Sequence, residues 1–231
     1  MTPPPVAPHP APHPAPQTAP HPQTDGARPL TAETVQALNA LCDRAEDADD
    51  RTPLVLRVTG APDGTPQAPL PLVNKWERAL RRLERLDRPT VALATGDCGG
   101  TALDLLLATD HRIATPGTRL LPATGPAGVW PGMALYRLAH QAGVAAVRGT
   151  ALFGTPLDTA RAHALHLLDR VTDDPAAALA ELTAALGDTT DTAVRRQLLT
   201  DAATTGFDEA LGRHLAACDR MLRRTPAEIA P

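Results

Sequence analysis

The chain has 231 residues, which is enough for one sizeable domain with an appendage. Its formal net charge of −4 argues against a dedicated nucleic-acid binder, and two Trp, one Tyr and two Phe are too few for a base-stacking platform. It contains no serine, which excludes a Ser-His-Asp hydrolase.

Targeting and metal-binding patterns are also missing from the sequence. No apolar run reaches the length of a membrane span, and the N-terminus lacks a secretory pattern, so we expect a cytoplasmic protein without a membrane partner. Cys42, Cys98 and Cys218 lie too far apart for a zinc motif and are odd in number. We therefore expect neither a disulfide framework nor a metal site.

Residues 1–28 are rich in Pro, Ala and His, and Val6 is their only large apolar residue. This composition predicts a disordered tail that leans towards polyproline II. Its histidines could bind a metal, but a low-complexity extension without a site is the favoured interpretation. We place an α/β core at residues 29–174 and a helical C-terminal region at 175–231.

The first half of the core alternates helical and strand patterns. Residues 30–47 have apolar side chains at helical spacing after a Thr31 cap, and residues 53–58 form a short apolar run typical of a buried strand. Residues 73–87 predict an amphipathic helix with one basic face. That face either binds phosphates or is a solvated surface laced with Glu77 and Glu84 pairs, and we favour the second interpretation.

The most informative stretch of the sequence runs from Arg88 to Thr115. It predicts a buried strand at 90–95, a glycine-rich turn at 96–100, an apolar helix at 101–109 and a second strand at 111–115. Such an order places free backbone N–H groups at a helix N-terminus, where they can hold a developing oxyanion.

This stretch, RPTVALATGDCGGTALDLLLATDHRIAT, resembles the signature of the enoyl-CoA hydratase/isomerase (crotonase) superfamily. Aligned without gaps, eight positions match the signature, and the segment from Gly154 to Val171 resembles a second family motif. The eight are Pro89, Gly96, Gly100, Leu105, Asp110, Arg112, Ile113 and Ala114. The resemblance implies a crotonase fold of repeated ββα units with a helical C-terminal region. Residues 72–115 are similar to an actinobacterial branch from the 3,5-dihydroxyphenylglycine pathway.

The same resemblance implies an oxyanion hole with two backbone donors. The glycine turn places one donor at Gly100 and Thr101. The other would come from Ala68 or Leu70, because Pro69 has no N–H. Trp130 falls in a turn that feeds a pocket-lining helix, where it could touch the acyl group.

Two glutamates carry protons in the family's hydratases, and both positions differ here. One falls on Asp104, whose place in the apolar run LDLLLA favours a site role over a structural hydrogen bond. The other falls on Thr124, which cannot serve as a carboxylate base, so we expect its hydroxyl and that of Thr101 to assist Asp104 in moving a proton. Cys98 could be a nucleophile near a helix end, but a small buried apolar residue is the favoured interpretation.

By resemblance, the chain is an enzyme acting on a polyketide-derived acyl-CoA and assists dehydration or aromatisation to 3,5-dihydroxyphenylacetyl-CoA. Coenzyme A would be part of the substrate, without a separate cofactor. The alternatives are a non-catalytic partner of a type III polyketide synthase or of a second crotonase, or a different reaction such as isomerisation or thioester hydrolysis. Helices expected at 175–186, 192–204 and 207–224 would cover the site and build a homotrimer or hexamer.

Overall fold

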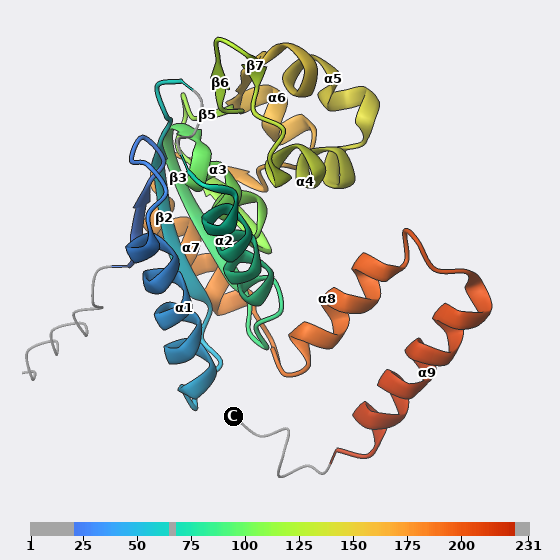
Figure 1. Cartoon of the computed structure of the whole chain (residues 1–231). Helices are drawn as coiled ribbons and strands as arrows, with labels where there is room; N and C mark the ends of the chain where they lie inside the picture. Colours follow the sequence, from blue (N-terminus) through green and yellow to red (C-terminus); the bar gives the residue numbers. More distant parts are fainter. Residues whose placement is uncertain (1–20, 65–67, 225–231) are drawn as a thin grey trace, which may run out of the picture.

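A computed structural model describes residues 21–64 and 68–224, in which strands and helices alternate before a run of helices (Figure 1). The strands are β1 (Gln23–Asp25), β2 (Leu54–Gly60), β3 (Thr90–Gly99), β4 (His111–Ala114), β5 (Arg119–Leu121), β6 (Thr124–Gly125), β7 (Gly128–Val129), β8 (Leu157–Asp158) and β9 (Arg170–Val171). The helices are α1 (Ala32–Asp47), α2 (Leu70–Leu83), α3 (Gly100–Leu107), α4 (Met133–Ala142), α5 (Val144–Phe153), α6 (Thr159–Ala164), α7 (Pro175–Ala185), α8 (Thr192–Asp201) and α9 (Phe207–Leu222).

The main sheet has the order β1-β2-β3-β4-β9, and each of these neighbouring pairs is parallel. The second half of β3 changes neighbours and pairs with β5, which pairs in turn with β8. β3 bends at this change, and its register with β2 shifts after Val58. Gly60 and Gly96 have φ values of 82° and 62° there, a conformation that residues with a Cβ rarely adopt.

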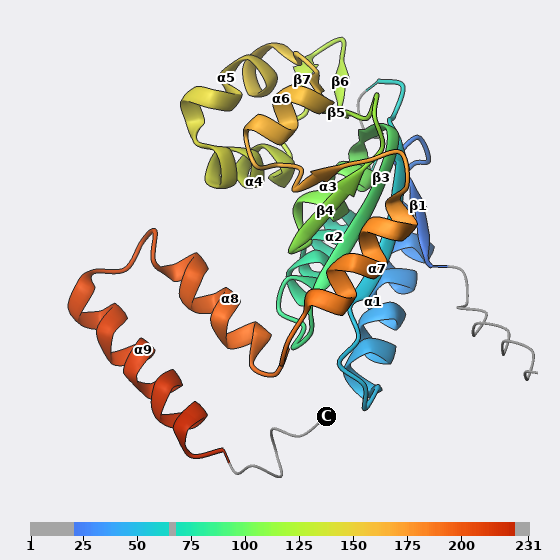
Figure 2. The ribbon, with the colours of Figure 1, turned by 180° about the vertical axis from the view of Figure 1, so that it is seen from behind.

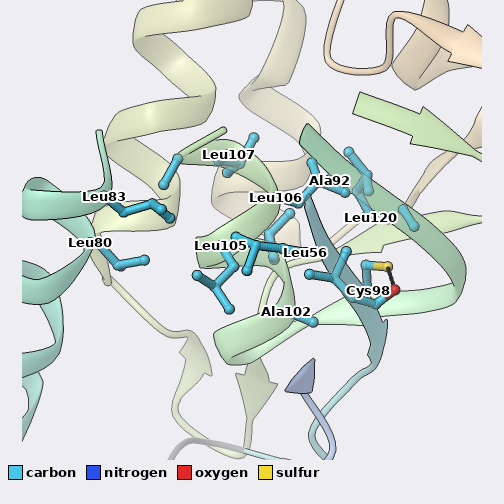
Figure 3. Close-up of a cluster of buried hydrophobic side chains, with 14 of the residues drawn as sticks. Leu56, Leu80, Leu83, Ala92, Cys98, Ala102, Leu105, Leu106, Leu107 and Leu120 are labelled. Atoms are coloured by element: carbon cyan, nitrogen blue, oxygen red, sulfur yellow. Dashed lines mark hydrogen bonds between the residues drawn. The ribbon is translucent and has the colours of Figure 1, made fainter. Parts of the chain in front are cut away.

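Helices cover both faces of this sheet, so its central strands are apolar on both sides. Figures 1 and 2 show α1, α2 and α3 on one face and α7 on the other. Successive strand residues divide between the two cores: Leu56 and Ala92 face the larger one, whereas Val55 and Val91 face α7. Figure 3 shows leucines of α2 and α3 meeting the sheet in the larger core.

Most predicted elements of the core are confirmed, and Thr31 caps α1 by accepting from the Thr34 N–H at 3.2 Å. One predicted border is wrong. β1 lies inside the expected tail of residues 1–28 and pairs with β2, while residues 1–20 lie outside the described part. α7 begins at Pro175, where the C-terminal helical region was expected to begin, and its Ala178 is buried against the sheet.

The last two helices extend from this body (Figures 1 and 2). No residue of α8 or α9 is buried, and several of their large apolar side chains are exposed. Along the described residues, the helices are too short or too polar to cross a bilayer.

Candidate active site

A cavity opens where β1, β2 and β3 end, at the carboxyl edge of the parallel sheet. Open α/β sheets commonly bind their ligands at this edge. α2, α3 and α4 supply further walls. The lining residues are Gly26, Arg28, Pro29, Leu30, Pro62, Ala68, Val73, Trp76, Glu77, Gly100, Thr101, Leu103, Asp104, Pro122, Ala123, Trp130, Gly132, Met133, Ala134 and Leu135.

The N-terminus of α3 forms one end of the cavity. Gly100 begins the helix with a φ of 51°, and both Gly100 and Thr101 line the cavity. The first N–H groups of a helix have no intrahelical acceptor and carry its positive partial charge. This end of α3 is therefore equipped to hold an oxyanion, as the sequence predicts.

The packing around this helix end requires glycine. A Cβ on Gly26 would lie 2.0 Å from the Gly99 carbonyl oxygen, and one on Gly100 would lie 3.1 Å from the Gly26 carbonyl oxygen. The β1–α1 connection therefore presses directly against the start of α3. The sequence assigns Gly26 and Arg28 to a tail, because a three-residue strand leaves too short a pattern to recognise.

The two candidates for the other oxyanion donor separate in the structure. Ala68 lines the cavity. Leu70 is the first residue of α2, is 74% exposed and does not line the cavity. Of the pair, only Ala68 is placed to face a substrate.

Asp104 lies one helical turn after Thr101, so both side chains share a face of α3 and line the cavity. Trp76 of α2 donates from its indole Nε1–H to Asp104 Oδ2 at 2.9 Å. Burial raises the pKa of Asp104 to about 7, against the lowering effect of the Trp76 N–H; the Glu77 charge adds to the rise and Arg137 opposes it. A carboxyl with this pKa can take or give a proton near neutral pH.

Glu77 also lines the cavity, although the sequence places it on a solvated helix face. Its Oε2 lies 2.9 Å from Arg137 Nη1, and Arg137 Nε donates to Glu84 Oε1 at 2.8 Å. The Arg137 side chain is only 8% exposed. The available signal was the seven-residue spacing of Glu77 and Glu84, which places them on one helix face with Leu80.

Trp130 and Thr124 belong to one hairpin but face differently. Trp130 lines the cavity, as predicted. Thr124 does not: its hydroxyl donates to the Pro122 carbonyl at 3.1 Å, and a Cβ on Gly154 would lie 2.8 Å from it. Pro122 and Ala123, just before β6, line the cavity, whereas Thr124 at the start of β6 does not.

Cys98 is fully buried in β3 and does not line the cavity. Burial raises the pKa of its thiol to about 12, which keeps the thiol protonated at neutral pH. Cys98 therefore packs as a small apolar residue. On α2, Arg81 pairs with Glu84 and Arg82 with Glu46, which accords with a solvated helix face at those two positions.

Comparisons with known proteins agree with this architecture. The chain is 55% identical over 205 residues to a protein of Amycolatopsis orientalis named Enoyl-CoA-hydratase, covering 87% of this chain and 94% of that protein. No family model matches it.

Solved structures share the fold at lower identity. An enoyl-CoA hydratase/isomerase from Marinobacter aquaeolei has a TM-score of 0.73 at 16% identity, covering 87% of this chain and 86% of that one. An enoyl-CoA hydratase from Bacillus anthracis has a TM-score of 0.71 at 18% identity, covering 87% and 84%. With the crotonase fold and a close relative of nearly full length, the chain belongs to the enoyl-CoA hydratase/isomerase (crotonase) superfamily.

Proposed function

We propose that the protein is an enoyl-CoA hydratase-like enzyme that acts on an acyl thioester of coenzyme A through an enolate. The observation that carries this proposal is the pairing of Asp104 with the N-terminus of α3 in one cavity. The Thr101 N–H, with a second donor near Ala68, would hold the thioester oxygen as negative charge develops on it. Asp104, whose pKa is raised to about 7, would move the proton at the neighbouring carbon.

The acyl group we propose is a polyketide-derived chain, which the enzyme helps to dehydrate or aromatise to 3,5-dihydroxyphenylacetyl-CoA in secondary metabolism. Support comes from residues 71–115, which resemble the enoyl-CoA hydratase-like B protein of the 3,5-dihydroxyphenylglycine pathway. The largely apolar walls of the cavity, including Leu103, Trp130 and Leu135, suit a carbon chain or a ring. Pathway partners would be a type III polyketide synthase and a second crotonase.

The partner-subunit alternative rests on the missing second glutamate, since Thr124 occupies that position and lies away from the cavity. In that case the protein raises the output of a synthase without proton transfer by Asp104. The two functions differ in whether the Asp104 carboxylate is needed.

One experiment separates them. The purified protein is incubated with crotonyl-CoA, and separately with the tetraketide-forming synthase and malonyl-CoA, and products are followed by mass spectrometry. We expect Asp104→Asn to lower turnover by about 10² to 10⁴-fold, the usual contribution of a general acid or base. Asp97→Asn is the matched control, because Asp97 is paired with Arg119 outside the cavity. Equal stimulation of the synthase by wild type and Asp104→Asn would establish the partner function instead.

A further inference from the structure

The site contains a second carboxyl that the sequence motifs do not assign. We propose that Glu77 of α2 is the second proton-transfer group, in place of the glutamate that Thr124 replaces; this rests on the proposed function. Glu77 and Asp104 line the same cavity from two facing helices. Trp76, the residue before Glu77, contacts Asp104 directly, which fixes the two helices against each other at this point.

The surroundings of Glu77 dispose it to carry a proton. Glu77, Arg137 and Glu84 form a half-buried group with two carboxyls for one guanidinium. Burial raises the pKa of Glu77 above its ordinary value, against the lowering effect of Arg137, and the Glu84 charge adds to the rise. A buried excess of negative charge is relieved when one carboxyl binds a proton.

The hydrogen bonding of Glu77 is incomplete as well. Within the described part of the chain, neither its buried Oε2 nor Arg137 Nη1 has a well-aligned hydrogen-bond partner, although the two atoms lie 2.9 Å apart. Arg137 Nε, in contrast, makes an aligned bond to Glu84 at 2.8 Å. Arg137 thus lies close to both carboxyls but makes its aligned hydrogen bond to Glu84, which suits a structural role for Glu84.

Two carboxyls in one cavity complete a dehydration. The Asp104 carboxylate takes the proton from Cα of a β-hydroxyacyl thioester, and the electrons of that C–H bond form the enolate held at Thr101. The enolate then forms the Cα=Cβ double bond and the Cβ–O bond breaks. The Glu77 carboxylic acid gives its proton to the departing oxygen, which leaves as water. Asp104 afterwards loses its proton to solvent and Glu77 regains one, so the balance is the loss of one water.

The test measures the two proton transfers separately. Hydration of crotonyl-CoA, or dehydration of whichever thioester wild type turns over, needs both groups; exchange of the Cα hydrogens of butyryl-CoA with D₂O needs only Asp104. We expect Glu77→Gln to lower kcat for hydration or dehydration by about 10²-fold or more, while Cα exchange stays within about threefold of wild type. Asp104→Asn is expected to lose both reactions.

Glu84→Gln is the matched control. Glu84 shares Arg137 with Glu77 and is similarly shielded, at 18% against 19% side-chain exposure, yet it does not line the cavity. We expect it to leave both reactions within about threefold of wild type. Equal losses in Glu77→Gln and Glu84→Gln, or a Glu77→Gln variant that still hydrates, would overturn the role of Glu77 alone.

Two further readouts keep the proposal open to refutation. If Glu77→Gln does not fold, by circular dichroism, Glu77→Asp is measured; it keeps the charge but withdraws the carboxyl by one methylene, and an unchanged kcat overturns the proposal. A wild-type protein that neither exchanges Cα hydrogens nor turns over any thioester overturns the proposed function, and the role of Glu77 with it.

Discussion

Asp104 is surrounded by leucines. Its carboxyl group is useful for catalysis, but the ionised form of that group destabilises the folded chain. Its pKa of about 7 in the folded chain lies above the ordinary value of 3.8. Between these pH values the folded state binds more protons than the unfolded state, so this group's contribution to stability is lost as pH rises from about 4 to about 7. Above about pH 7 the stability lost through ionisation of Asp104 no longer changes with pH.

We therefore expect Asp104→Asn to stabilise the protein at pH 8, by at most about 4 kcal/mol, and to have little effect near pH 4. Asn keeps an oxygen that can accept the Trp76 N–H, so the contact between α2 and α3 is retained. Urea unfolding of both proteins across this range measures the difference. A gain that is the same at pH 5 and pH 8 would contradict the raised pKa.

Asp97→Asn is expected to have the opposite effect on stability at neutral pH. The Arg119 guanidinium beside Asp97 holds the pKa of that carboxyl below its usual range. Ionised Asp97 therefore adds a little stability at neutral pH, which the variant should lose. Because the pair is exposed at the surface, we expect a small change there.

At the scale of elements, an arginine of α8 makes a cluster of bonds between the C-terminal helices and the body, beside the Ala193 N–H that donates to Asp87. Arg196 of α8 forms a forked pair with Asp110, with N–O distances of 2.5 and 2.7 Å, and donates to the carbonyls of Leu86 at 2.8 Å and Arg88 at 3.0 Å. Asp110 also accepts from the N–H and hydroxyl of Thr90, both at 2.9 Å. The aspartate of the family signature thus connects the starts of β3 and β4 to α8.

Arg196→Met should release α8 from the body while leaving the sheet intact. We expect the free energy of opening at residues 192–201 to fall by about 2 to 4 kcal/mol, because several charge-assisted hydrogen bonds are lost together. Amide hydrogen exchange measures this. Arg195→Met is the control, since Arg195 makes only long contacts, of 3.3 and 3.5 Å, to Asp188 and Thr192. Equal protection in the two variants would show that Arg196 is not the anchor.

At the scale of the whole molecule, α9 touches α8 but buries none of its own residues against the described part of the chain. It contains no buried residue, and Phe207, Leu211, Leu215 and Leu222 are exposed along it. Helices of this length are stable in water mainly when an apolar face is packed. We propose that other copies of the chain cover this face, in the homotrimer, or hexamer of two trimers, expected from the family resemblance.

Light scattering should then give three or six times the mass of one chain. The double substitution Leu211→Glu and Leu215→Glu places two charges one turn apart on the proposed interface, and we expect it to yield monomers. His214→Glu, an exposed position on the same helix, should leave the assembly unchanged. A monomeric wild-type protein would refute this assembly.

The amino-acid sequence by itself determined the features that depend on neighbours along the chain. The apolar periods of residues 90–95 and 101–109 predict β3 and α3, although the stretch expected as a glycine turn belongs mostly to β3, which runs to Gly99 directly before α3. The apolar surroundings of Asp104 were also foreseeable, because its neighbours in the sequence, Leu103 and Leu105, are apolar and are buried in the structure. The alternation of strands and helices therefore gave the fold class.

Only the tertiary structure decided the features that depend on residues far apart in the sequence. β1 is recognisable as a strand through its pairing with β2, and α7 joins the core because Ala178 meets the sheet. Thr124 lies outside the cavity because of the direction in which its hairpin runs. Glu77 lies in the cavity wall beside Arg137, which α4 places against α2. Local periodicity tells which side of an element is apolar, whereas long-range packing decides which polar groups at the edge of that side become buried together.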